Sequence, residues 1–412
     1  MRSFPRLALL AGFSLVLSTS VAGAGNPPGP AEGAAPPPAA GEPDDGSKVS
    51  YVTLGAVIPR GLGIDPFGAL YLWRAPVSGE SRFRAQLTGI ANEVRFDKRI
   101  GPDGSLAWVA TLDSMTLPWE QWETVQGTEV RSGELKWGQG RVGAGFALHG
   151  PLGPRESYNG LDGALTLEAG ALWFARGSET AQSYVLPTDT FEARLHFRFR
   201  ADALERNLLA LPVQGWSAGV DGTWGGRNKW APWGDPSAGL QTGGRSWLAA
   251  SVFAYAAFGV PGLPAEHRLI SSVHAGAGSD LDRFSAFQLG NGTTWGDFET
   301  LSRPIVPAAG MNEFSTSRYA IADLEYRVGL LPALFLQLRG TLAWVDRPVS
   351  VAGGIETRTG TFPAVTAGAT TGLPWDSALE FAWSWNFGLE NGGEGGPTKG
   401  RSGFLVTLVK VF

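Results

Sequence analysis

The most regular pattern in the chain is the alternation of apolar and charged residues over Thr190–Ala201. Phe191, Leu195, Phe197 and Phe199 fall on one side, and Glu192, Arg194, Arg198 and Arg200 fall on the other. Successive side chains of a strand point to opposite faces, so this stretch predicts a strand with one apolar and one charged face. Two folds accommodate such a strand. In a soluble sandwich the apolar face is core, whereas in a transmembrane barrel it meets lipid and the charges line a watery lumen.

Similar strands of about ten residues, separated by Gly, Pro, Asp or Asn, recur from Val49 to the end of the chain. Strict alternation returns in Arg318–Val328 and in Leu334–Trp344, and no stretch has the length and pattern of a spanning helix. In the predicted strand that follows Ser50–Ile58, Phe67, Ala69, Tyr71 and Trp73 share one face, which we expect to be the apolar, outward one. The region Trp119–Gly150 is less regular and predicts two or three shorter strands.

The aromatic residues favour the membrane barrel over the soluble sandwich. Trp, Tyr and Phe recur near the ends of the apolar faces, where a barrel marks its two membrane interfaces. Strands of about ten residues also match the length that a tilted strand needs to cross a bilayer. A body of about 365 residues, at roughly 20 to 25 residues per strand and connection, gives about 16 strands, an even number as in bacterial single-chain barrels. We therefore expect an all-β chain that forms one closed antiparallel transmembrane barrel.

The first 48 residues indicate that the chain is exported, and we expect them to lie outside the folded barrel. Arg2 and Arg6 precede an apolar run at Leu7–Leu17, and small residues ending at Ala24 follow, which is typical of a signal peptide over residues 1–24. Residues 25–48 are rich in Pro, Ala and Gly and predict a disordered spacer, which leaves residues 49–412 for the barrel. The location predicted by these features is the outer membrane of a Gram-negative bacterium, with its lipid as the first partner.

Composition removes several function classes. The chain has no cysteine, which excludes disulfides, thiolate metal sites and cysteine nucleophiles. Its net charge of −5 and the lack of a basic run argue against nucleic-acid binding. Four histidines without ligand spacing predict no metal site, and the Gly138, Gly140, Gly143 motif lies outside any βαβ unit, so no cofactor is expected.

The last strand carries an assembly signal. The chain ends in GFLVTLVKVF, which resembles the C-terminal signal of bacterial outer-membrane barrels through Phe404, Val406, Leu408 and Phe412. This resemblance implies the outer-membrane assembly machinery as a partner. Lys410 departs from the pattern on the lipid side, and we expect its long side chain to reach the headgroups.

The distal half also resembles the barrel of the outer-membrane assembly and two-partner secretion superfamily, the bacterial surface antigens. The resemblance covers about Pro212 to Phe412 and rests on landmarks in the family's order: Leu211–Gly215, Leu269–Gly278, Arg283–Gly292 and Ala322–Val328. It implies a loop folded into the lumen and a role in inserting or translocating a polypeptide cargo.

Two features depart from that family. The family's loop carries an Arg-Gly signature, whereas the loop candidates here are Trp295, Gly296, Asp297 and Phe298, with Trp295 in place of the Arg. The family's periplasmic domains also have no counterpart between the predicted signal peptide and the barrel, where only the spacer lies.

Lumen-facing charges are the remaining candidates for function. They either pair across the lumen and fill it or select solutes. They are Glu192, Arg194, Arg198, Arg200, Asp323, Glu325, Arg327 and Arg339. The alternative to polypeptide transport is thus a passive, porin-like solute channel. A third hypothesis, a lipid-side hydrolase, rests on the G-x-S-x-G match around Ser217, with His196 or His267 as its base, but Ser217 lies within an alternating strand and we expect no enzyme activity.

Overall fold

The computed structural model shows a closed antiparallel β-barrel of 16 strands, which confirms the predicted fold class. It describes residues 48–411 apart from 75–80, 89–90, 102–104, 117–120, 126–127, 153–159, 208, 210, 238, 292–302, 352–353 and 392–397. The predicted signal peptide, nearly all of the predicted spacer and Phe412 lie outside the described residues. Within the described part of the chain, no helix has the length and apolarity needed to cross a membrane.

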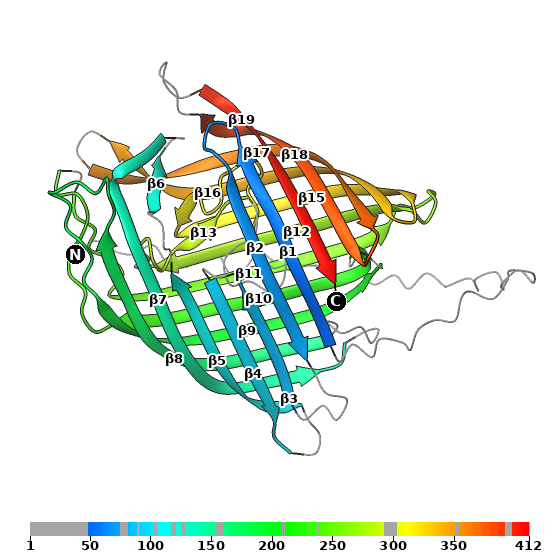
Figure 1. Cartoon of the computed structure of the whole chain (residues 1–412), viewed down its shortest axis with the longest axis horizontal. Coiled ribbons are helices and arrows are strands. Elements are labelled where there is room, and N and C mark those ends of the chain that lie inside the picture. The colour runs from blue at the N-terminus through cyan, green and yellow to red at the C-terminus, as the bar shows by residue number, and fades with distance from the viewer. Residues whose placement is uncertain are drawn as a thin grey trace, which may run out of the picture. The chain divides into compact units, whose positions relative to one another are not determined.

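The barrel strands follow one another in chain order around the wall (Figure 1). Their bounds are β1 (Lys48–Pro59), β2 (Asp65–Arg74), β3 (Ser81–Leu87), β4 (Ala91–Arg99), β5 (Leu106–Thr116), β7 (Thr128–Gly150), β8 (Gly160–Arg176), β9 (Thr190–Arg206), β10 (Pro212–Arg227), β11 (Ser246–Gly259), β12 (His267–Ser279), β15 (Arg318–Leu331), β16 (Leu334–Val351), β17 (Gly354–Leu373), β18 (Ser377–Asn391) and β19 (Thr398–Val411). Three short strands are additional to these 16. Strand β6 (Gln121–Val125) joins the same sheet by pairing with β7, and β13 (Phe287–Leu289) pairs with β14 (Phe314–Thr316) in a separate two-stranded sheet.

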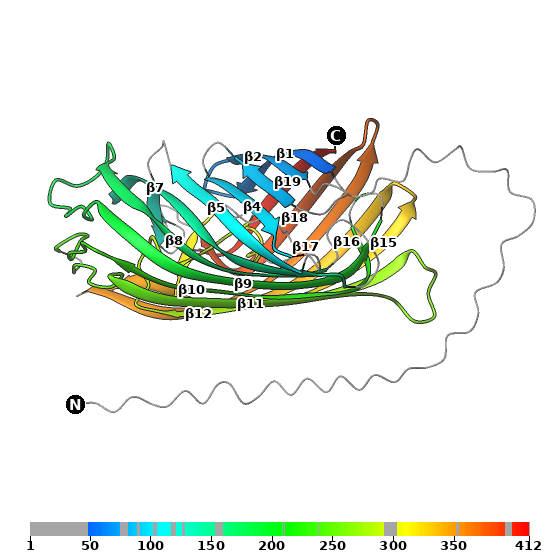
Figure 2. The same cartoon turned by 90° about the horizontal axis from the view of Figure 1, so that it is seen from below.

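The first and last strands close the barrel. The register of β1 with β19 runs without a break from Tyr51–Val411 to Pro59–Gly403. Closure leaves no free sheet edge at the chain ends, as lipid requires. Figure 2 shows the long curved wall that β8 to β12 form on one side.

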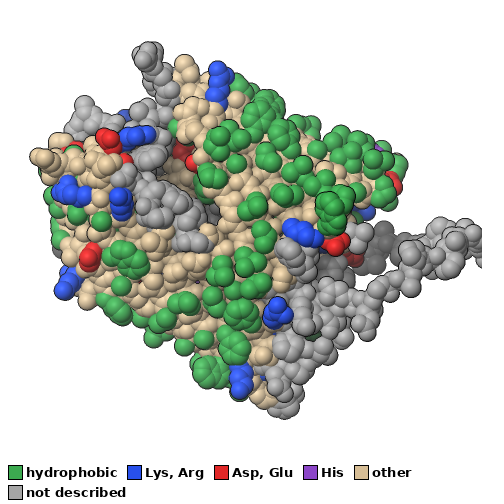
Figure 3. Space-filling view, in the orientation of Figure 1, with side chains coloured by type: hydrophobic (Ala, Val, Ile, Leu, Met, Phe, Trp, Pro, Cys, Tyr) green, Lys and Arg blue, Asp and Glu red, His purple; other side chains and the backbone are tan. Residues whose placement is uncertain are grey.

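The outer face of the barrel is apolar. Along β9, Phe191, Leu195 and Phe197 are exposed while Glu192 between them is buried, so the alternation predicted for this strand is present. Exposed tryptophans of neighbouring strands continue the apolar face, for example Trp216 and Trp224 on β10. Figure 3 shows apolar side chains spread over the outer surface, as a lipid-facing barrel requires.

The prediction that the aromatic side of β2 faces lipid is wrong. Leu70 pairs with the outward Val52, whereas Tyr71 stacks on Tyr51 with ring centroids 4.5 Å apart and is buried inside. The aromatic side of β2, with Phe67, therefore faces the lumen, and the leucines face lipid. Both sides of this strand are apolar, so the alternation alone does not identify the lipid side.

The region before Gly150 is also more continuous than predicted. Most of it forms one long strand, β7, and only Gln121–Val125 forms a separate short strand. The ring of Trp173 on β8 lies directly against the outer face of β7 at Gly138. A Cβ at this position would lie 2.5 Å from the ring, so a larger residue would not fit. Gly138, the first glycine of the motif, thus leaves room for the Trp173 ring.

Candidate functional site

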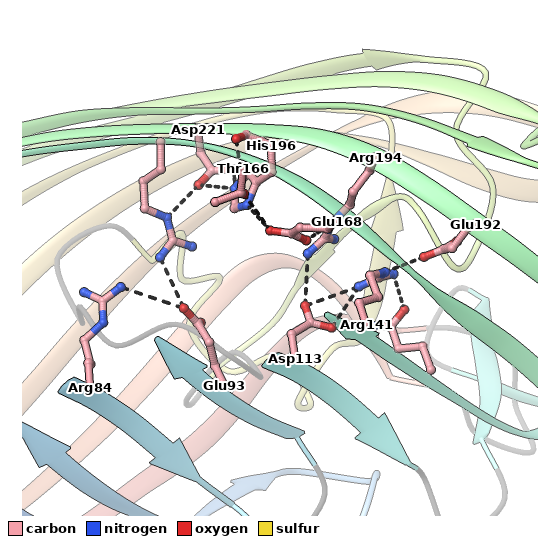
Figure 4. A network of polar contacts seen from close by, with 12 residues as sticks. Arg84, Glu93, Asp113, Arg141, Thr166, Glu168, Glu192, Arg194, His196 and Asp221 are labelled. Carbon is pink, nitrogen blue, oxygen red and sulfur yellow. Dashed lines mark hydrogen bonds and ion pairs between the residues drawn. The ribbon is translucent and has the colours of Figure 1, made fainter. Parts of the chain in front are cut away.

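The charged side chains of β9 point into the lumen and pair with strands on both sides. Arg194 Nε lies 2.5 Å from Glu168 Oε2 on β8, and Arg194 Nη2 lies 3.0 Å from Asp113 Oδ2 on β5 (Figure 4). Arg198 Nε donates to Asp221 Oδ2 on β10 at 3.1 Å. The alternation of β9 thus places a row of cations inside the barrel, where Arg194 and Arg198 contact carboxylates of other strands.

Some of these ion pairs cross the lumen. Arg198 Nη1 on β9 lies 3.5 Å from Glu93 Oε1 on β4, although β5, β7 and β8 separate the two strands along the wall. Arg141 on β7 joins Asp113 at 3.1 Å and Glu192 on β9 at 2.5 Å. The Arg198–Glu93 pair thus connects β9 to β4 across the lumen, whereas Arg141 connects β7 to its neighbour β5 and to β9.

A polar cavity of about 300 Å³ remains within this network. Its lining includes four arginines and four carboxylates together with His196, so its charges nearly balance: Arg95, Arg141, Arg194, Arg198, Glu93, Asp113, Glu168 and Asp221. His196 bridges two of the acids, with Nδ1 3.2 Å from Glu168 Oε1 and Nε2 3.0 Å from Asp221 Oδ1. The cavity is therefore lined by nearly balanced charges rather than by a ring of one sign.

A second charged group joins β4, β7 and β8. His149 Nε2 lies 3.3 Å from Asp97 Oδ2, and its Nδ1 lies 3.2 Å from Asp162 Oδ2. Arg95 contacts the same two carboxylates at 2.8 and 3.0 Å. One histidine and two carboxylates are a donor set that fits a metal ion, but the Arg95 guanidinium contacts both carboxylates, so we describe the group as a network of ion pairs.

The remaining predicted lumen residues also lie inside the barrel. Glu325 is buried between Arg327 Nη2 at 2.5 Å and Arg339 Nη2 at 2.6 Å. Asp323 accepts hydrogen bonds from Ser272 and Thr341. The Arg200 guanidinium lies 5.4 Å from the ring centre of Phe253.

The described parts of the segment between β12 and β15 fold into the lumen. We call its described parts, residues 280–291 and 303–317, the plug. Leu289, Val306, Ala308 and Ala309 are fully buried there. They pack against the inner wall of β15 to β18, which contributes Tyr319, Ile321, Ala343, Val345, Phe362 and Leu389.

Two buried ion pairs fasten the plug to the wall. Arg227 Nη1 on β10 lies 2.6 Å from Asp282 Oδ2, and both side chains are 1% exposed. Arg401 Nη1 on β19 lies 2.6 Å from Glu313 Oε2, with 0% and 4% exposed. The wall supplies both cations and the plug both anions.

The plug also touches the wall through neutral contacts. Asn386 Nδ2 donates to the Pro307 carbonyl at 3.0 Å. Phe284 packs edge-on against Trp137 of β7 with ring centroids 5.2 Å apart, within a cluster of aromatic residues. The plug therefore reaches both sides of the barrel.

The predicted loop residues Trp295, Gly296, Asp297 and Phe298 lie outside the described residues. The segments that flank them, up to Asn291 and from Arg303, are buried in the lumen. A parallel bridge between Gly290 and Ile305 joins these flanks.

The described hydrogen bond of the Ser217 hydroxyl joins it to the backbone rather than to a candidate base. The Ser217 hydroxyl is buried and donates to the Ala201 carbonyl at 3.2 Å. The contacts described for His196 are with Glu168 and Asp221, and His267 Nδ1 contacts the hydroxyl of Tyr326. Neither histidine is hydrogen-bonded to Ser217 in the described part of the structure.

On the last strand, Phe404 and Leu408 are exposed on the outer face, and Val406 shares that face. Lys410 donates through Nζ to the carbonyl of Trp375, in the turn between β17 and β18. The lysine thus reaches the rim of the barrel rather than staying at lipid depth.

Sequence reasoning did not identify Arg141, Arg227, Arg401, Asp282 or Glu313 as site residues. Arg227 and Arg401 had a signal, because each is a cation on the inward side of an alternating strand. The plug acids had none, since irregular segments carry no facing pattern.

No protein-family model matches the chain, and no curated protein matches it. Among solved structures, the chain is similar to BamA from Haemophilus ducreyi lacking POTRA domains 1–3, with a TM-score of 0.52 and 9% identity over 89% of this chain and 70% of that one. It also matches CdiB from Acinetobacter baumannii, with a TM-score of 0.48 and 10% identity over 88% of this chain and 60% of that one. The Pseudomonas putida toluene transporter TodX matches with a TM-score of 0.34 and 9% identity over 89% of each chain.

The likeness to BamA shows that the chain has this barrel fold. With its apolar outer face, the barrel is an integral outer-membrane protein.

Proposed function

We propose that this barrel inserts or translocates polypeptides at the outer membrane, with the plug as the part that must move. The observation that carries the proposal is the position of the plug, which lies in the lumen and is fastened by the ion pairs of Arg227 and Arg401. The landmarks shared with the assembly and secretion superfamily, and the fold shared with BamA, support the same function.

Ion pairs suit a part that moves. The apolar part of the plug loses its burial on release, whereas the wall arginines and the plug acids regain water when they separate. The inner wall remains charged after release, with further acids and arginines along β8, β9 and β16. A hydrated, charged wall tolerates the passage of a polypeptide backbone because water satisfies its polar groups.

A disulfide between plug and wall tests this proposal. A Cβ at Gly403 would lie 3.4 Å from the Cβ of Ala308, close to the roughly 3.5–4.5 Å that a disulfide spans. The chain has no cysteine, so Ala308→Cys with Gly403→Cys forms a single cross-link. The variant is reconstituted in vesicles, and the folding rate of a urea-unfolded eight-stranded outer-membrane barrel is measured with and without reductant.

We expect acceleration of folding only in the reduced variant and in the wild type. The two single-cysteine variants serve as controls and should behave alike under both conditions. If reduced and wild-type protein neither accelerate folding nor export a polypeptide, the proposal is wrong. If the oxidised variant is as active as the reduced one, the plug does not move.

We also propose that the outer-membrane assembly machinery recognises β19 of this chain during its own biogenesis. Phe404 and Leu408 present the apolar face that the terminal signal requires. Phe412→Ala should lower the folded fraction in cells while refolding in detergent stays unchanged. Equal loss in both settings would indicate a stability defect instead.

The second candidate function is a passive solute channel, and the polar cavity of about 300 Å³ favours it. Vesicle swelling with neutral and charged solutes of similar size distinguishes this function. Rapid solute entry that Arg194→Met changes for charged solutes alone would support the channel.

A further inference from the structure

The inner face of β3 and β4 carries a cluster of arginines. The register places Arg84 of β3 directly opposite Arg95 of β4, and like charges that face each other across two strands destabilise a sheet. Arg82 and Arg99 lie on the same side of these strands, next to that pair. Three of the four, Arg82, Arg84 and Arg95, line one narrow polar cleft inside the barrel. We call these four residues the arginine patch.

The two acids beside the arginine patch already have other partners. Asp97 lies 2.8 Å from Arg95 Nε and 3.3 Å from His149 Nε2. Asp162 lies 3.0 Å from Arg95 Nη1 and 3.2 Å from His149 Nδ1. One arginine and one histidine thus share both carboxylates, although Asp97 stands opposite Arg82 in the register.

Two arginines of the patch are left without a carboxylate. Arg84 Nη2 has Glu93 Oε1 at 3.8 Å (Figure 4). Within the described part of the structure, neither Arg82 nor Arg99 forms an ion pair. Arg99 Nε is buried and has no hydrogen-bond partner there. A buried donor without an acceptor is costly, so a ligand that supplies acceptor oxygens at this position is favoured.

Both arginines lie at the periplasmic mouth of the lumen. Strand β3 begins at Ser81 and β4 ends at Arg99, at the same end of the barrel as the short turns 332–333 and 374–376. The opposite end carries longer connections, such as residues 228–245, and short turns mark the periplasmic side of such barrels. Arg82 and Arg99 are only half-buried, so a solute in the periplasm can reach them.

We propose that Arg82 and Arg99 bind a small oxyanion, the phosphate or carboxylate group of a periplasmic solute. Arg99 follows two residues after Asp97, the register partner of Arg82, so the two arginines are diagonal neighbours roughly 7–8 Å apart. Two long side chains at this spacing reach one anion together. The planar guanidinium group donates two parallel hydrogen bonds to a phosphate or carboxylate. The bound anion also offsets the repulsion within the arginine patch.

The orientation of the patch favours a solute over a lipid headgroup. The four arginines face the lumen, whereas Phe96 and Lys98, which alternate with them along β4, are exposed on the outer face. Lys98 is therefore the cation of this strand that meets lipid, and it serves as the matched control. It is the direct neighbour of Arg99 in sequence but lies on the other side of the wall.

Anion titration of the purified protein in detergent tests the site. Binding of sodium phosphate and of sodium succinate is measured by calorimetry, with sodium chloride keeping the ionic strength constant. The variants are Arg82→Gln and Arg99→Gln, and the control Lys98→Gln removes the same charge from the outer face. The urea midpoint of each protein is measured with and without phosphate, because a ligand that binds only the folded state raises it.

We expect each arginine variant to weaken anion binding at least about tenfold, because charge-assisted hydrogen bonds are lost. Lys98→Gln should stay within about twofold of the wild type. Since neither arginine forms an ion pair, both variants should fold, with urea midpoints in phosphate-free buffer no lower than that of the wild type. Phosphate should raise the midpoint of the wild type and of Lys98→Gln, but not that of the two arginine variants.

Tighter binding of phosphate than of succinate would assign the site to phosphorylated solutes, and the reverse order would assign it to carboxylates. Either order supports the proposal if both arginines are needed. Binding of neither anion to the wild type would overturn it, and so would equal binding by the wild type and both arginine variants. A loss in Lys98→Gln as large as in Arg99→Gln would also overturn it, since general charge rather than the lumen site would then be responsible.

Discussion

Removal of the Arg227 side chain tests how the plug is held. The guanidinium donates to Asp282 Oδ2 at 2.6 Å, to the Gly244 carbonyl at 2.8 Å and to Glu192 Oε2 at 3.3 Å. It also lies 4.1 Å from the ring centre of Trp230. Arg227→Met keeps the volume of the side chain and removes its charge, which leaves two buried carboxylates with less compensation.

The expected size follows from the burial of the pair. Removing one partner of a buried ion pair costs about 3–5 kcal/mol, because the other charge stays buried. Asp282 regains water only when the plug leaves the wall, so this cost favours the released plug. Since about 1.4 kcal/mol corresponds to a tenfold change, the released population should rise by about 100-fold to a few thousand-fold.

A single cysteine in the plug measures that population. Ala309 is fully buried, and Ala309→Cys adds the only thiol in the chain. Its labelling rate with a water-soluble maleimide in vesicles should rise by the same factor when Arg227→Met is added. Asp282→Asn is a second variant, because it removes the charge while its amide oxygen still accepts from Phe284 N and Ser285 N.

The control is an ion pair at the surface. Arg358 and Glu356 lie 3.3 Å apart with side chains 57% and 60% exposed, and such pairs contribute less than about 1 kcal/mol. Arg358→Met should leave the labelling rate within a few-fold of the parent. A rate that stays within about twofold for Arg227→Met, in protein that remains folded, would refute the account of the plug anchor.

Three further predictions concern the wall. Arg194→Met removes a cation shared by two carboxylates and should lower the free energy of unfolding in urea by about 3–5 kcal/mol. An unchanged unfolding midpoint would show that these ion pairs do not stabilise the barrel. Leu167→Arg, at a lipid-facing site 64% exposed near the middle of β8, should cost about 2–4 kcal/mol in vesicle refolding, whereas Trp173→Arg near the strand end should cost about 0–1 kcal/mol. Ser217→Ala should leave phospholipid turnover at the background level of the wild type. It should lower the free energy of unfolding by about 1 kcal/mol, because the hydrogen bond to the Ala201 carbonyl is lost. Measurable turnover in the wild type that Ser217→Ala abolishes would instead support the hydrolase hypothesis.

The alternation in the sequence correctly predicted which side of a strand faces the lumen where that side is charged. Strand β9 is the example, since Glu192 and Arg194 are incompatible with lipid and so identify the inner side. Strand β2 has no charge between Phe67 and Trp73, and there the register with β1 decides which side faces inward. The strand number could be estimated from the length of the chain, because about 365 residues at roughly 20 to 25 residues per strand and connection give about 16 strands.

The partners of the lumen charges could not be predicted in the same way. Glu93 and Arg198 meet only because the barrel curves back on itself, and no local pattern encodes that curvature. The plug acids Asp282 and Glu313 lie in an irregular segment, where neither period applies. Tertiary closure, rather than strand propensity, creates these pairs.

Planar-bilayer recording of the wild-type protein tests the central claim most directly. If the ion pairs across the lumen and the plug together block passage, the barrel should show no steady conductance, only a closed baseline with brief openings. The oxidised Ala308→Cys, Gly403→Cys variant should lose these openings. A steady, open conductance in the wild type would contradict the account and identify the barrel as a passive channel.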